Sequence, residues 1–212
     1  MSNRSRTRSS TTPRKLRVLG VDPAVAGATG YGIVECEGPA ARLLRFGALK
    51  LSRRATFAAR LCEVHRLISG LVKEFAPDAV AVESVFTALN VRTALKLAEV
   101  RGVVLLAAAQ ASIPAQSYSP REVKATVAGY GGASKQQMQQ MVASLLGLAS
   151  HPEPADAADA LAVALCHAQL SRARERIAVA MGVPPVGITS RSEIRGAKIS
   201  QRNRARTAHI QN

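Results

Sequence analysis

Three apolar, strand-like segments follow one another before the first helical pattern of the chain. They cover residues 15–22, 31–37 and 41–51 and are joined by short connections. Strands that follow one another so closely pair as antiparallel neighbours, so the segments predict a hairpin meander. The glycines around the first connection are expected to be turn and bend residues: Gly27, Gly30 and Gly32.

Helical and strand-like patterns alternate after the meander. Helices are predicted where apolar residues recur three and four positions apart, and strands where short apolar runs lie between turn signals. The expected elements are a helix at 56–75, a strand at 79–83, a helix at 91–111, a strand at 115–119 and helices at 120–127, 134–146 and 154–176. This order predicts an α/β fold in which a five-stranded mixed sheet carries helices on both faces.

Basic residues concentrate at the two ends of the chain. The 212 residues carry a formal net charge of +15, of which +6 lies in residues 1–17, +7 in residues 171–212 and only +2 between them. We therefore expect a disordered basic extension at 1–15, one globular domain at 16–177 and a disordered basic tail at 178–212. Such tails either tether DNA or merely keep a protein in solution, and both interpretations stay open.

Composition narrows the function classes. The excess of positive charge favours an anionic partner such as nucleic acid, whereas 3% aromatic residues and no Trp argue against a surface of many stacking rings. No apolar run approaches the roughly 18 residues of a membrane span, so no membrane contact is expected. The cysteines lack zinc-site spacing and predict buried thiols of a cytoplasmic protein: Cys36, Cys62 and Cys166.

Four carboxylates lie where an α/β sheet usually builds its site. Asp22 ends the first strand and Glu83 ends the fourth, although an Asp-Pro turn and a solvated strand end would explain each of them alone. Asp156 and Asp159 share one side of the first turn of the last helix, where aspartate also serves as a helix cap. Two like charges in an apolar segment repel each other, and a hard divalent cation such as Mg²⁺ would offset this repulsion. Four carboxylates suit two ions that clamp a phosphodiester.

Four motifs along the chain resemble the RuvC family of Holliday junction resolvases, within the RNase H-like nuclease superfamily. They are GVDP, AVESVF, SPREVKATVAGYGGASKQQMQQMV and ADAADALAVALCH, and the resemblance runs from about Leu16 to Arg176. It implies an RNase H-like fold and a magnesium-dependent endonuclease with two ions per subunit, for which Mn²⁺ is a possible substitute. The family's metal-binding and catalytic carboxylates fall on four residues: Asp22, Glu83, Asp156 and Asp159.

The resemblance also implies contacts to DNA. The family's junction-opening aromatic falls on Phe86 and its phosphate-contacting lysines on Lys124 and Lys135. From the residues alone, Phe86 could equally pack against the core and Lys135 could be a solvated lysine at a helix start. The loop after Asp22 departs from the family pattern, because Ala24 stands where the family has glycine and the loop is one residue longer.

The implied activity is the paired, symmetric nicking of a four-way DNA junction in recombination and repair. The resemblance implies a homodimer and cooperation with the RuvA and RuvB branch-migration proteins, since two symmetric cuts call for two sites related by a twofold axis. The apolar helix at 91–111 is predicted to be mostly buried, either at the dimer face or inside the subunit. Alternative functions are a fragment of an actin-like ATP-dependent phosphotransferase and a non-catalytic, basic junction-binding protein. The segment GYGGASK lacks the ending of a nucleotide-binding P-loop.

Overall fold

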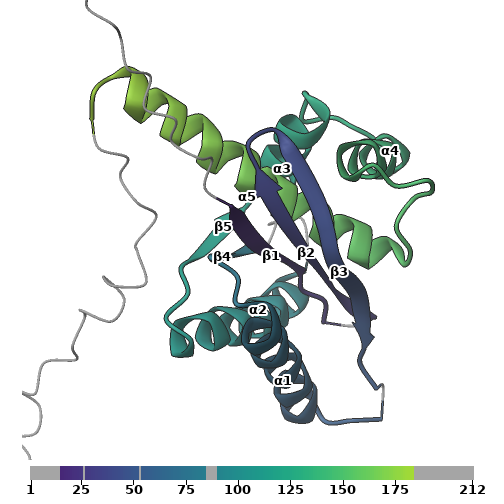
Figure 1. Cartoon of the computed structure of the whole chain (residues 1–212). Helices are drawn as coiled ribbons and strands as arrows, with labels where there is room; N and C mark the ends of the chain where they lie inside the picture. Colours follow the sequence, from purple (N-terminus) through teal and green to yellow (C-terminus); the bar gives the residue numbers. More distant parts are fainter. Residues whose placement is uncertain (1–14, 26, 53, 85–89, 184–212) are drawn as a thin grey trace, which may run out of the picture.

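One mixed sheet forms the centre of the protein, with two layers of helices around it (Figure 1). The computed structural model describes residues 15–25, 27–52, 54–84 and 90–183. Phe86 lies outside these residues, as do most of the two basic ends. The expected five-stranded mixed sheet with helices on both faces is confirmed.

The sheet has the strand order β3-β2-β1-β4-β5. A meander of β1 (Leu16–Asp22), β2 (Ala28–Glu37) and β3 (Ala40–Lys50) pairs antiparallel, as predicted. The later strands, β4 (Ala79–Glu83) and β5 (Ala115–Tyr118), extend the sheet in parallel from β1. Parallel pairing puts the carboxyl ends of β1, β4 and β5 at one edge of the sheet.

Among the residues that the structure describes, five helices accompany the sheet, and four of them begin at a polar cap. Thr56 caps α1 (Phe57–Phe75), and Asn90 caps α2 (Val91–Gln110). Ser119 and Ser134 form capping boxes at α3 (Pro120–Ala128) and α4 (Lys135–Leu146). The last helix, α5 (Ala155–Ala180), continues four residues further than predicted.

Alternating side chains divide the interior into two cores. On β1, Val18 packs on the α5 side, whereas Leu19 and Val21 pack on the side of α1 and α2. The β4 residue Ala81 joins the α5 side and its neighbour Val82 joins the other. Asp22 and Glu83 continue the alternation of their strands, and their side chains therefore belong to the α5 face.

Glycines on this face let α5 lie very close to the sheet. A Cβ at Gly20 would overlap the Ala160 carbonyl oxygen, and one at Gly30 would overlap the Asp156 carbonyl oxygen. At Gly32 a Cβ would lie 2.5 Å from a methyl group of Leu161. The prediction that Gly30 and Gly32 are turn residues is therefore wrong, because both lie inside β2 and their missing side chains make room for a helix.

The burial expected for α2 and for Cys62 is corrected by the structure. Helix α2 is not mostly buried within the subunit, since Val91, Leu95 and Leu106 are 75%, 61% and 52% exposed. Two basic side chains of α2 contact neighbouring elements: the Arg101 guanidinium donates to Ser117 Oγ at 2.6 Å, and Lys96 Nζ lies 5.6 Å from the Phe57 ring centre. Among the cysteines, Cys36 and Cys166 are buried as expected, but Cys62 is exposed on α1.

None of the described helices combines the length and apolar character needed to span a bilayer.

Because α5 lies so close to the sheet, we expect two glycine substitutions to change the free energy of unfolding differently. Gly30→Ala should lower the free energy of unfolding by on the order of 1–3 kcal/mol, because the new methyl group must push the α5 backbone away. Gly70→Ala is the matched control, since an added Cβ on this exposed helical position meets nothing within 4 Å and improves helix propensity. Urea denaturation measures both, and equal stability of Gly30→Ala and the wild type would contradict the packing argument.

Candidate active site

The structure brings the four predicted carboxylates into one electrostatically coupled group. Val21 pairs with Val82 in the parallel ladder, so the next residues, Asp22 and Glu83, end adjacent strands side by side. Gly30 is the partner of Asp22 on β2, and the Asp156 backbone lies directly over Gly30. Asp159 follows one turn later on α5 and raises the pKa of both strand carboxyls.

Neither aspartate of α5 acts as the helix cap. Pro154 occupies the cap position and makes no side-chain hydrogen bond, while Asp156 lies inside the first turn. The helix dipole still favours negative charge there, but two half-buried carboxylates exceed what capping requires. The capping interpretation therefore does not explain this pair.

The group holds more negative charge than its surroundings readily accept. Burial, followed by repulsion from Glu83 and Asp159, raises the pKa of Asp22 to about 8. Burial also raises the pKa of Glu83, although a hydrogen bond with Asp22 and the charge of Lys124 act against this rise. Such shifts mean that full ionisation of the group needs positive charge close by.

Both predicted phosphate-contacting lysines lie at this group. Lys135 Nζ is 3.2 Å from Asp159 Oδ2, and Lys124 acts electrostatically on Glu83. Together they line a cavity of about 210 Å³ with Glu83 and Asp159, and α3, α4 and α5 supply its remaining walls. A phosphodiester in this cavity would therefore meet lysine ammonium groups and carboxylates at once. Phe86 lies outside the described residues, so its place relative to the cavity stays a prediction.

The donor set fits a hard divalent cation by its chemistry. All four side chains offer carboxylate oxygens, which Mg²⁺ prefers, and the cation would offset the repulsion that raises the pKa of Asp22. Within the described part of the chain, no three His, Cys, Asp or Glu side chains are already arranged as one ligand set. Asp22 and Glu83 instead share a hydrogen bond and Asp159 pairs with Lys135, so side-chain rotation would have to free these oxygens.

Sequence reasoning missed two features that support the site. Gly20 and Gly30 position α5, and only Gly20 carried a signal, as an isolated glycine within an otherwise strand-like apolar run. Tyr118 ends β5 beside Glu83, and its hydroxyl lies 2.8 Å from Nδ1 of the buried His167 on α5. This contact ties the edge of the sheet to the helix that carries both aspartates. In the altered loop after Asp22, the Ala24 amide donates to the buried Thr29 hydroxyl at 3.3 Å.

The raised pKa of Asp22 predicts that stability falls as pH rises. In EDTA, folded Asp22 keeps a proton that the unfolded chain releases near pH 4, so the folded state binds more protons between about pH 4 and 8. The free energy of unfolding should therefore decrease across this window. Asp22→Asn should flatten the decrease, measured by urea denaturation from pH 5 to 8.5. Glu37→Gln, at an exposed position, should keep the wild-type slope, and the same slope in Asp22→Asn would refute the assignment.

Comparison with known proteins gives one consistent result. Residues 18–167 match the family described as crossover junction endodeoxyribonuclease RuvC. A RuvC of Chloroflexus aggregans is 46% identical over 164 residues, covering 77% of this chain and 99% of that protein. The structure of Thermus thermophilus RuvC superimposes with a TM-score of 0.70 at 37% identity, covering 74% of this chain and 96% of that one. The same protein in complex with a Holliday junction substrate gives a TM-score of 0.69 at 35% identity. With a family match over most of its length and relatives of this identity and coverage, the chain belongs to the RuvC family of crossover junction endodeoxyribonucleases.

Proposed function

We infer that this protein resolves Holliday junctions by cutting DNA phosphodiester bonds in recombination and repair. The observation that carries the inference is the carboxylate group at the carboxyl edge of the sheet, combined with membership of a family of metal-dependent junction endonucleases. A non-catalytic junction-binding protein has no use for four carboxylates facing DNA, because they repel phosphate unless cations neutralise them. The RuvC match from 18 to 167 likewise favours hydrolysis over a phosphotransferase fragment.

The four carboxylates would hold the metal. Asp22 and Glu83 approach it from the sheet, and Asp156 and Asp159 approach it from the helix. Two Mg²⁺ ions bound there would supply an activated water and stabilise the departing 3′ oxygen, and Mn²⁺ is a plausible replacement. The products would carry 5′-phosphate and 3′-hydroxyl ends.

The lysines would hold the scissile phosphate against the carboxylates. Lys124 and Lys135 both line the cavity with Glu83 and Asp159, so a phosphate there is within reach of both ammonium groups. When Lys135 turns to the phosphate it releases the Asp159 oxygen that it now contacts. Arrival of DNA and availability of a carboxylate for metal are thereby linked. Phe86, three residues beyond Glu83, is proposed to stack on a base at the open junction centre.

A homodimer would form through the exposed face of α2. Its exposed apolar and small residues recur at helical spacing along one side: Val91, Leu95, Ala98, Gly102, Leu106 and Ala109. Large apolar side chains that are more than half exposed gain stability when a second copy covers them, and small residues allow two helices to approach. A twofold pair also provides the two sites that paired nicks require.

The remaining partners follow from the substrate. We propose that the protein acts in the bacterial cytoplasm on junctions that the RuvA and RuvB proteins move along DNA. The basic residues 1–17 and 171–212 would add sequence-independent contacts to phosphate.

The dimer proposal predicts a local effect of charge on α2. Leu95→Glu should weaken association at least roughly tenfold, because a carboxylate would be buried at the centre of the interface. Sedimentation equilibrium measures the dimer dissociation constant. Ile177→Glu, at a 58% exposed position near the end of α5, is the matched control and should leave it unchanged. Dimers of undiminished stability in Leu95→Glu would exclude this face.

The catalytic proposal predicts a separation of cutting from binding. Asp156→Asn should abolish Mg²⁺-dependent nicking of a synthetic four-way junction and keep junction binding within a few-fold, because the change removes a metal ligand and retains the shape of the side chain. Glu153→Gln, an exposed carboxylate just before α5, should cut like the wild type. Linear duplex is the substrate control. Full cleavage by Asp156→Asn would remove this residue from the mechanism.

A further inference from the structure

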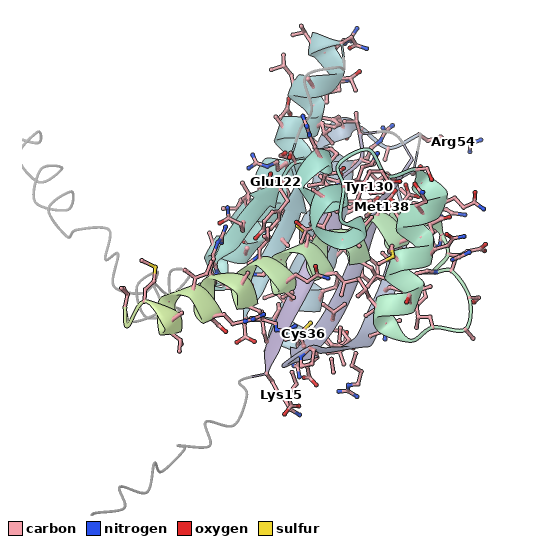
Figure 2. The ribbon with its side chains drawn as sticks, turned by 90° about the horizontal axis from the view of Figure 1, so that it is seen from above. Lys15, Cys36, Arg54, Glu122, Tyr130 and Met138 are labelled. Carbon is pink, nitrogen blue, oxygen red and sulfur yellow. The ribbon has the colours of Figure 1, made fainter. Side chains whose placement is uncertain are left out.

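An aromatic ring lies exposed on the loop between α3 and α4, where burial does not account for it. Tyr130 is 48% exposed, and Figure 2 shows it close to Met138 of α4. Its hydroxyl donates to Gln137 Oε1, which also accepts from the Ser134 amide in the capping box of α4. The ring is therefore anchored to the first turn of a helix while much of its surface faces solvent.

Two glycines of the same loop, Gly131 and Gly132, leave space in which neighbouring side chains lie against the backbone. A Cβ at Gly131 would lie 2.7 Å from Arg121 Cγ and 3.3 Å from its Nε, so Arg121 extends along the loop backbone. A Cβ at Gly132 would lie 3.7 Å from the ring carbons of Tyr130. An aromatic ring and a guanidinium thus lie on one loop, each against backbone that carries no side chain. We call these two residues, Arg121 and Tyr130, the loop platform.

The loop platform continues the positive wall of the cavity. Arg121 and Lys124 are three residues apart on α3 and thus neighbours on its surface, and Lys135 begins α4 on the other side of the loop. The one acid next to Arg121 in sequence is already engaged, because Glu122 accepts from the Ser119 amide and hydroxyl at 2.9 Å. Arg121 therefore adds a positive charge between the cavity that Lys124 and Lys135 line and the exposed ring of Tyr130.

We propose that the loop platform binds the DNA strand next to the bond that is cut. The Arg121 guanidinium would take a neighbouring phosphate through paired hydrogen bonds, and the Tyr130 ring would pack against the adjacent base or deoxyribose. This inference rests on the proposed function, because it assumes a DNA strand in the cavity that Lys124 and Lys135 line. The loop platform would bind the strand at positions beyond the scissile phosphate.

The two residues make different predictions for salt dependence. Junction dissociation constants measured in Ca²⁺ at several salt concentrations should show that Arg121→Gln reduces the slope of log K against log salt by about 0.9, the value of one phosphate contact. Tyr130→Ala should raise the dissociation constant roughly 5- to 20-fold without a change of slope, because an aromatic ring carries no charge. Tyr130→Phe keeps the ring, loses only the bond to Gln137 and should retain most of the affinity.

Controls separate this inference from the proposed function. Arg66→Gln, an exposed arginine of α1 in the other helical layer, should behave as the wild type, and thermal melts should show all four variants folded. Wild-type affinity and slope in both Arg121→Gln and Tyr130→Ala would overturn the loop platform while leaving junction cleavage intact. A wild-type protein that neither binds nor cuts junctions would overturn the proposed function itself.

Discussion

The close approach of α5 to the sheet is the constraint on which the site depends. Asp156 and Asp159 belong to a helix whose backbone lies where side chains of Gly20 and Gly30 would otherwise be. Because Gly30 is also the ladder partner of Asp22, the contact that seats the helix brings its first aspartate beside the strand carboxylate. The contacts that pack α5 on the sheet therefore also set the positions of the carboxylates, and displacing the helix would separate the four acids.

Charge balance is the second constraint and links the acids to the lysines. Burial and mutual repulsion raise the pKa of Asp22 and Glu83, and the structure meets this repulsion with the shared hydrogen bond and with Lys124 and Lys135. Each of these contacts occupies oxygens that a divalent cation would take. Under the proposed function, the lysines would serve the acids in one state and a DNA phosphate in another, which would account for both kinds of charge in a cavity of about 210 Å³.

Much of this architecture could be predicted from the sequence, because the spacing of apolar residues and the residues that start and end elements are local signals. The strand ends at Asp22 and Glu83 and the helix starts near Thr56 and Ser134 were all visible in the residues themselves. The role of Gly30 was not, since a glycine within a strand and one at a bend look alike until the opposing helix is in place. The sequence also left open whether α2 is covered inside the subunit or by a second copy, because apolar content shows that a face must be covered but does not show which molecule covers it.

The central claim is that sheet and helix carboxylates hold the same metal, and anomalous diffraction from crystals grown with Mn²⁺ tests it most directly. The account predicts strong peaks between the carboxyl edge of β1 and β4 and the first turn of α5, within bonding distance of oxygens from both sides. Peaks bound by carboxylates of the sheet alone or of the helix alone would contradict it. So would an ordered site with no peak at saturating Mn²⁺.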